Sequence, residues 1–298
     1  MKLKSLLCYA LAAAVFAGGG CSDDKNEPPA EPGTIDMTRM TADEVTTAVK
    51  EALAAGVTEF KLKGEFAKIG IPEQSFGASA GNPFYGSDVE TIDLTGVTDW
   101  PKVNTNGKID ENNNYLPGDA RGLPVSAFNG LDGGYPALRE VKLPAEVKAI
   151  GSAAFIACQA LTSVSCDGVE EVGWQAFSYC SALTTVELPE TTRIYGFAFM
   201  GSGLTSLSLP KATFLGNGVF NQCPDLTTLR LTAPGNLTLE KKDGGTFITG
   251  NIAAQCSLTL NADKHYDTGT ASPKAVSADQ WATNYYEDPL TWKSIAFE

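Results

Sequence analysis

The sequence predicts an α+β solenoid of stacked coils, with short strands, an N-terminal capping helix and a C-terminal cap. A seven-residue phrase, LTTVELP at residues 183–189, has near-copies on both sides, and its first leucine recurs every 21 to 23 residues. A second phrase, which ends in Ala-Phe or Val-Phe, follows most copies at a similar distance. Fixed apolar positions at a period of about 20 to 30 residues indicate units that must stack to bury a core.

Residues 1–20 have the composition of an export signal peptide. Lys2 and Lys4 form a basic start, an apolar run follows, and three glycines precede Cys21. The apolar run has 12 residues, whereas a helix needs roughly 20 to cross a bilayer, so we expect the segment to be cleaved. Small residues before a cysteine resemble a bacterial lipoprotein signal, which implies that Cys21 is lipidated and begins the mature chain. Secretion without a lipid is the alternative.

Residues 21–39 are predicted to be the lipidated cysteine and a flexible tether. The stretch SDDKNEPPAEPG is rich in charge and proline, which resist burial. It resembles the acidic tag that directs lipoproteins of Bacteroides-type bacteria to the outer face of the outer membrane. This resemblance implies a lipid-anchored protein of the outer membrane that is exposed at the cell surface.

The charge balance argues against two classes of partner. Signal cleavage would remove two lysines and leave 20 basic and 35 acidic side chains, a net charge near −15. A surface this acidic repels phosphate backbones and anionic lipid head groups. We therefore expect no nucleic acid partner, and membrane association only through the lipid.

Residues 40–56 are predicted to contain an N-terminal capping helix. Thr41 and Glu44 have the spacing of a capping box, the apolar residues that follow share one helical face, and Gly56 marks the end. We expect the helix over residues 42–55, where it would cover the open end of the stack.

Residues 57–260 are predicted to be the solenoid, with one short strand in each copy of the seven-residue phrase. Side chains alternate along a strand, so the fourth and sixth residues of the phrase point inward. These inward pairs are Val141 and Leu143, Val186 and Leu188, Leu207 and Leu209, and Leu229 and Leu231. The second phrase supplies the opposite wall of each coil with Ile150, Val172, Ile194 and Leu215 and with the Ala-Phe pairs.

Degenerate copies extend the stack in both directions. VTEFKL at Val57 and VETIDL at Val89 precede the clear copies, and CSLTL at Cys256 supplies a last strand. Residues 261–298 are predicted to be the C-terminal cap. Its expected parts are a second helix that begins near Ser277 and two tryptophans, Trp281 and Trp292, that seal the last coil.

The two phrases together resemble a known family of repeats. L-T-x-V-x-L-P, then V-x-x-I-G-x-x-A-F, then a cysteine, is similar to the BspA-like leucine-rich repeats of bacterial surface proteins. The resemblance covers about residues 57–260 and is strongest over 138–231. It implies a curved or ribbon-like, right-handed leucine-rich repeat solenoid and an association with adhesion to host proteins. Two copies depart from the pattern, with Gly201 at the cysteine position and Cys166 at a strand leucine position.

The cysteines are predicted to be core residues. Cys158, Cys180 and Cys223 each follow a phrase-ending phenylalanine by three residues. Neighbouring coils lie roughly 4.8 Å apart, which is within reach of disulfide geometry. Burial as free thiols is favoured, because free cysteine is among the most buried residue types, and disulfides are the alternative. No C-x-x-C occurs, so no zinc site is expected.

The sequence does not predict an enzyme, a cofactor or a metal site. His265 is the only histidine, so a catalytic triad would depend on that residue alone. The stretch NTNGKIDENN resembles a calcium loop, but Lys102 and Asn113 occupy positions that require aspartate and glutamate. A stack of coils also rarely supplies the deep pocket that catalysis needs.

Two regions are candidate binding surfaces. An insertion at about residues 95–130 contains Trp100 and Tyr115, and insertions in repeat proteins often carry the binding function. A second irregular coil is the alternative reading of this interval. The outward positions of the strands form a flat, mostly hydroxyl-bearing strip without aromatic residues: Glu140, Lys142, Ser163, Ser165, Thr185, Glu187, Ser206, Ser208, Thr228 and Arg230.

These features predict a cell-surface, lipid-anchored binding protein that mediates protein–protein interaction or adhesion. Its partner is expected to be another protein, with a host extracellular protein as one candidate. The alternative is an accessory glycan-binding lipoprotein of an uptake system, with Trp100 and Tyr115 as the residues that stack on sugar rings.

Overall fold

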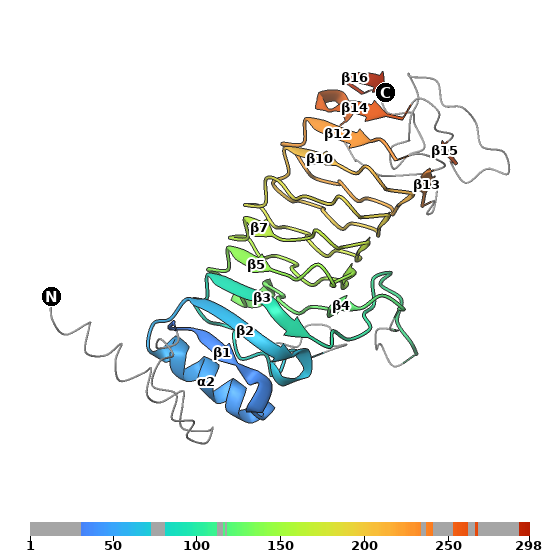
Figure 1. Ribbon diagram of the computed structural model, residues 1–298. Helices are drawn as coiled ribbons and strands as arrows, with labels where there is room; N and C mark the ends of the chain where they lie inside the picture. Colours follow the sequence, from blue (N-terminus) through green and yellow to red (C-terminus); the bar gives the residue numbers. More distant parts are fainter. Residues whose placement is uncertain are drawn as a thin grey trace, which may run out of the picture.

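The protein is an elongated stack of coils. The computed structural model describes residues 31–72, 81–111, 116, 118–233, 237–240, 253–261, 266–267 and 292–298. Successive coils lie side by side along the long axis, and each regular coil contributes one strand to each of two faces (Figure 1). Every pair of named strands is parallel. A single apolar core runs between the two faces.

The first face carries the strands of the seven-residue phrase and one further strand at each end, arranged in two sheets. The strand at the N-terminal end, Thr34–Asp36, lies within residues 21–39, so the prediction that this interval is a flexible tether is wrong for residues 34–36. The five-stranded sheet has the order β1 (Thr34–Asp36), β2 (Glu59–Glu65), β3 (Thr91–Thr98), β5 (Glu140–Lys142) and β7 (Ser163–Val164). The four-stranded sheet has the order β10 (Ser206–Ser208), β12 (Thr228–Leu231), β14 (Ser257–Leu260) and β16 (Ser294–Phe297). The predicted inward pairs are all buried, which confirms the alternation.

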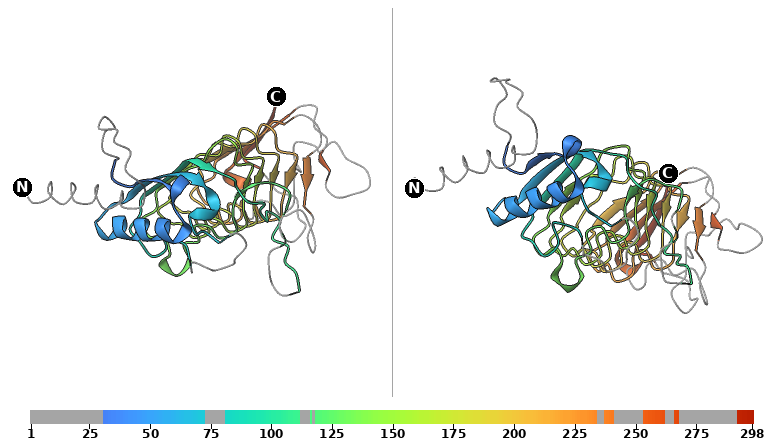
Figure 2. Two further views of the ribbon diagram at one scale, coloured as in Figure 1. Left: turned by 60° about the horizontal axis from the view of Figure 1, so that its bottom comes forward. Right: turned by 90° about the horizontal axis from the view of Figure 1, so that it is seen from below.

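The second face is one seven-stranded sheet built from the second phrase. Its order is β15 (Tyr266–Asp267), β13 (Leu237–Leu239), β11 (Phe214–Leu215), β9 (Arg193–Ile194), β8 (Glu171–Val172), β6 (Ala149–Ile150) and β4 (Gly122–Leu123). The strands are short because a turn follows directly, in which Ala153, Gln175 and Phe197 have a left-handed backbone. Figure 2 shows the two faces from two further directions.

The predicted helix is present as α2 (Ala42–Ala54) at the N-terminal end of the stack (Figure 1). The backbone N–H of Thr41 donates to Glu44 Oε2 at 2.8 Å, and that of Glu44 donates to Thr41 Oγ1 at 3.3 Å, so both halves of the capping box form. Its buried residues Val45, Ala48, Val49 and Ala52 join the core. Within the described part of the chain, no helix is long and apolar enough to cross a membrane.

Four short 3-10 helices complete the described structure: η1 (Met37–Arg39), η2 (Phe66–Lys68), η3 (Leu131–Gly133) and η4 (Ala253–Gln255). In the C-terminal region, Trp292 is buried in the core next to β16. The predicted helix near Ser277 and Trp281 lie outside the described residues.

A row of stacked phenylalanine rings forms the centre of the core. Ring centroids lie 5.5, 5.3, 5.3 and 6.2 Å apart along the row, and neighbouring rings are within 18° of parallel. Each ring belongs to the next coil, so the distance between ring centroids is close to the separation of adjacent strands, about 4.8 Å. The centroid distance is slightly larger than that separation. The row consists of Phe128, Phe155, Phe177, Phe199 and Phe220, all fully buried.

The repeat cysteines connect this row to the backbone. The Sγ atoms of Cys158, Cys180 and Cys223 donate to the carbonyl oxygens of phenylalanines in preceding coils at 2.8, 3.1 and 3.0 Å. The five cysteines of the described region are buried and unpaired. The assignment of Gly201 to the cysteine position is wrong by one residue, because Ser202 occupies it, is buried, and lies 3.6 Å from Cys223 Sγ.

The insertion belongs to one coil and is not a second irregular coil. β3 ends at Thr98 and pairs with β5, whereas β4 begins at Gly122 and pairs with β6. Both strands therefore belong to the same coil, and the inserted segment is residues 99–121.

Replacing one ring of the phenylalanine row tests its contribution to stability. Phe177→Ala removes a buried ring that stacks on both sides, and we expect the free energy of unfolding to fall by about 3 to 5 kcal/mol. Phe297 is 47% exposed, so Phe297→Ala should cost less than about 0.5 kcal/mol. Urea unfolding followed by circular dichroism measures both. Equal losses for the two variants would contradict a central role for the row.

Candidate functional site

The outer surface of the first face presents mainly hydroxyl groups in its middle part. Ser163, Thr185, Ser206 and Ser208 are exposed, and Thr228 is half-buried. Charged side chains gather toward the N-terminal strands, where Glu59, Lys61, Lys63 and Glu65 all point outward from β2. The predicted strip is therefore present, and no aromatic side chain projects from its described strands between Glu140 and Arg230.

The sheet of the first face is interrupted in the middle of this strip. No strand forms at residues 183–188 between β7 and β10, although this is the clearest copy of the phrase. The backbone N–H of Thr205 still donates to Thr184 O at 3.0 Å. Within the described structure, the backbone N–H and C=O groups of residues 185–187 have no backbone partner. The main-chain hydrogen bonds that join neighbouring coils are therefore missing at residues 185–187.

A shorter connection coincides with this break. Leu204 follows Phe199 by five positions, whereas Leu161 follows Phe155 and Leu183 follows Phe177 by six. Gly203 lies in the short connection, and a Cβ there would be 2.1 Å from the backbone oxygen of Ser181. Only glycine therefore fits this close approach of two coils.

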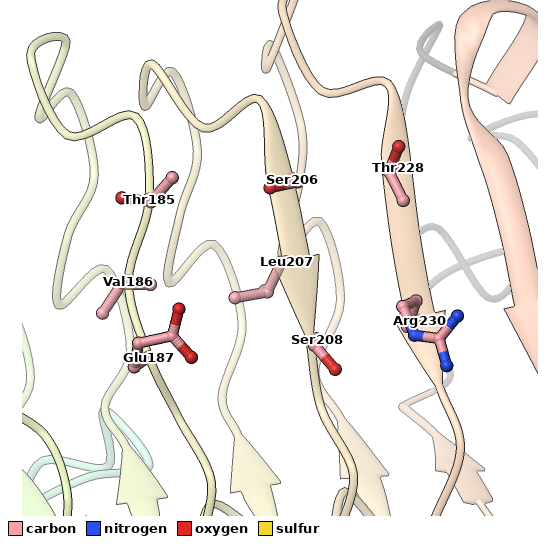
Figure 3. A pocket seen from close by; sticks show the side chains of 8 residues that line it. All are labelled: Thr185, Val186, Glu187, Ser206, Leu207, Ser208, Thr228 and Arg230. Carbon is pink, nitrogen blue, oxygen red and sulfur yellow. The ribbon is translucent and has the colours of Figure 1, made fainter.

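A shallow depression of about 250 Å³ lies at the break. Figure 3 shows Glu187 at one side and Arg230 on β12 at the other, with Ser206 and Ser208 between them. Arg230 also forms an ion pair with Glu298, which follows β16. The full lining is Thr185, Val186, Glu187, Ser206, Leu207, Ser208, Thr228 and Arg230.

In three copies of the phrase, the threonine that follows the first leucine has a structural role. Thr162 Oγ1 donates to Arg139 O at 3.0 Å, Thr205 Oγ1 to Thr184 O at 3.3 Å, and Thr227 Oγ1 to Thr205 O at 3.2 Å. These hydroxyls connect one coil to the preceding one. The hydroxyls of the depression make no such bond within the described structure, so they are available to a ligand.

The prediction that Trp100 stacks on a ligand is wrong, because Trp100 is a core residue. Its side chain is 3% exposed, its Nε1 donates to Val97 O at 3.0 Å, and its ring centroid lies 5.0 Å from that of Phe66. Alternation cannot reveal this burial, because the ring lies in an irregular segment. Tyr115, Cys21 and His265 lie outside the described residues.

The inserted segment is held against the second face by Asn104, which is fully buried. Its backbone oxygen accepts from the N–H of Ser152 at 2.8 Å, and its Oδ1 accepts from Ser152 Oγ at 2.8 Å and from Gly107 N at 2.9 Å. In the next coil, Trp174 N donates to Thr105 O at 2.7 Å. Farther out, Ile109 and Leu116 are 49% and 46% exposed.

A cluster of aromatic rings around Arg193 was missed by the sequence analysis. The guanidinium carbon lies 4.5 Å from the ring centroid of Phe214 and 5.4 Å from that of Tyr195. The cluster is on the outer surface of the second face, whereas the predicted strip consists of outward positions of the first face. Alternation applied to the second phrase would have found it, because Arg193 and Tyr195 flank the buried Ile194.

The buried thiols are unreactive as nucleophiles, because their pKa values are raised. Burial raises the pKa of the Cys166 thiol to about 12 and that of Cys256 to about 11. Burial also raises the pKa of Cys158, Cys180 and Cys223. Because the thiolate is the reactive form, these cysteines are poor nucleophiles at neutral pH. Within the described residues, no group of three His, Cys, Asp or Glu side chains could hold a metal ion.

Comparison with known proteins agrees with the observed repeat. Residues 123–239, less than half of the chain, match the model of the BspA type leucine rich repeat region in six copies. These residues form a BspA-type leucine-rich repeat region. No curated protein matches the chain. The leucine-rich repeats therefore include the second face from β4 to β13 and the interrupted part of the first face.

Three solved structures are similar to the chain. A leucine-rich repeat protein of Treponema pallidum is 28% identical, with a TM-score of 0.36, 50% of this chain covered and 62% of that one. A leucine-rich repeat protein of Bacteroides ovatus is 19% identical, with a TM-score of 0.33, 64% of this chain covered and 55% of that one. A leucine-rich cell surface protein of Faecalibacterium prausnitzii is 16% identical, with a TM-score of 0.22, 70% of this chain covered and 66% of that one. The chain thus spans less than two thirds of each of these proteins.

The buried thiols predict a loss of stability at alkaline pH. A folded-state pKa above the unfolded value of 9.0 means that unfolding releases a proton above pH 9, so the free energy of unfolding falls as pH rises. For Cys166 the loss extends from pH 9.0 to about 12. Each such thiol contributes a slope of about 1.4 kcal/mol per pH unit. Urea unfolding of the wild type and of Cys166→Ala at several pH values should give a shallower slope for the variant, and identical slopes would contradict the assignment.

Proposed function

We propose that this protein is a lipid-anchored binding protein of the cell surface whose partner is another protein. Leucine-rich repeat proteins generally mediate protein–protein interactions, and residues 123–239 carry six such repeats. The binding surface in this proposal is the outer side of the first face around residues 185–187 and β10. The first phrase therefore serves the core with its inward residues and the partner with its outward residues.

The break in the sheet is the observation that supports this surface. Residues 185–187 form no strand and no backbone hydrogen bond within the described structure, and the depression beside them places hydroxyls between Glu187 and Arg230. A depression of about 250 Å³ is smaller than the 300 to 1,000 Å³ typical of small-molecule sites. A flat, polar surface with hydrogen-bond donors and acceptors suits the polar rim of a protein interface better.

Lipid anchoring and surface exposure belong to the same proposal. The support is the sequence alone, namely the signal-like residues 1–20, the cysteine at position 21 and the acidic stretch that follows. Such an anchor would hold the repeats near the membrane, and the partner would be a protein of the surroundings, with host extracellular proteins as the first class to test.

Trp100, one of the two residues predicted to stack on sugar rings, is not available for the accessory glycan-binding role. Trp100 is buried and bonded to Val97 O, so it cannot act as an exposed platform. A glycan role would need other aromatic residues, and the described structure offers these on the second face.

Substitutions in the depression test the protein-binding surface. The double substitution Ser206→Arg and Ser208→Arg would fill the depression and place bulky charge in the interface. We therefore expect affinity for a protein partner to fall at least about tenfold. Ser181→Arg is the matched control, because Ser181 is exposed and does not line the depression. Surface plasmon resonance against a panel of purified host extracellular proteins measures the change. Binding that is lost equally in both variants, or no binding by the wild type, would count against this surface.

Protease treatment of intact cells tests the location. We expect the repeat region to be digested while a periplasmic control protein survives, and we expect Cys21→Ala to abolish labelling with a lipid probe. Lysed cells show whether the fold itself resists the protease. Protection in intact cells together with digestion in lysed cells would place the protein inside the outer membrane, and lipid labelling of the Cys21→Ala protein would refute the anchor.

A further inference from the structure

The second face carries an arginine whose orientation is set by aromatic rings. By strand register, Arg193 on β9 lies opposite Glu171 on β8 and Phe214 on β11. Its guanidinium carbon lies 4.5 Å from the ring centroid of Phe214, and its Nε donates to the hydroxyl of Tyr195 at 3.1 Å. The side chain therefore leans toward β11 and away from Glu171.

The guanidinium of Arg193 has no acidic partner in the described structure. Glu171 is the nearest candidate by register, but its Oε2 accepts from Thr105 Oγ1 at 2.6 Å. Other arginines differ, since Arg139 and Arg230 form ion pairs with glutamates. The two terminal nitrogens of Arg193 thus keep the planar set of donors that matches a carboxylate.

The surroundings of Arg193 are apolar and half-buried. Tyr195 and Phe214 lie 5.5 Å apart between ring centroids, and both are half-buried. Trp174 of the preceding coil lies against Gly196, the residue after Tyr195, and against Gly107 of the insertion. The described part of the insertion bonds to the coils of Ser152 and Trp174, next to the coils that carry the cluster.

We propose that this cluster, defined as Arg193, Tyr195 and Phe214, binds an acidic carbohydrate of the uronic acid class. The carboxylate of the sugar pairs with the terminal nitrogens of Arg193, and the apolar face of the sugar ring packs on the neighbouring aromatic rings. The protein is acidic overall, so attraction of the carboxylate depends on Arg193 alone, a local cation without an acidic partner among the described residues. Flat rings beside a single guanidinium suit a cyclic ligand with one carboxylate better than an extended acidic peptide.

This site is separate from the one proposed for a protein partner. The depression lies on the first face, whereas Arg193 belongs to the sheet of the second face. Failure of either proposal leaves the other intact, and their substitutions do not overlap.

Titration calorimetry of the mature chain with oligogalacturonate tests the inference. We expect measurable binding of oligogalacturonate, no binding of a neutral galactan of the same length, and no binding of hexaglutamate. Arg193→Gln should weaken binding at least about tenfold, because a charge-assisted pair is lost, and Arg193→Lys should recover only part of it. Lys148→Gln is the control, because Lys148 lies beside the same sheet, two strands away, and is ion-paired with Glu170 at 3.3 Å.

Thermal unfolding of each variant establishes that it is folded. Equal weakening by Arg193→Gln and Lys148→Gln would show a general charge effect and overturn the site. Equal binding of the neutral galactan would overturn the role of the carboxylate. Binding of hexaglutamate as tightly as oligogalacturonate would replace the carbohydrate with an acidic peptide, and absence of any oligogalacturonate binding would end the proposal.

Discussion

The stacking of one phenylalanine ring on the next is the contact on which the described repeats depend. Rings 5.3 to 6.2 Å apart hold neighbouring coils close to the distance at which parallel strands bond. A single coil cannot bury such a ring, since both of its faces need a neighbour. Stacking therefore makes each coil depend on the coils before and after it, which is the physical reason that the two phrases recur.

The backbone bonds of the turns follow from this row. The thiols of Cys158, Cys180 and Cys223 satisfy phenylalanine carbonyls inside the core, where an unpaired oxygen would be costly. Between Phe199 and Leu204 the connection is one residue shorter, and the first face loses its strand at residues 185–187. The core remains continuous at this point, so the shorter connection changes only the hydrogen bonding of the first face.

The two faces consequently differ in chemistry although they share one core. The first face exposes hydroxyls, which suit a broad polar contact. The second face is covered in part by the insertion, and beyond it Arg193 lies over aromatic rings. A solenoid can support both surfaces, because the outward residues of one coil hardly affect the burial of its inward residues.

The sequence by itself determined the period, the inward residues of both phrases, the helix α2 and the burial of the cysteines. These features depend on alternation, capping and composition within one coil, which are local. The sequence placed Gly201 one residue away from the true position and offered Trp100 as a surface residue. Only the tertiary structure decided that Trp100 packs on Phe66, that the sheet breaks at residues 185–187, and that the insertion docks through Asn104. Each of these depends on contacts between coils or with an irregular segment, and no periodic pattern records where such a segment folds.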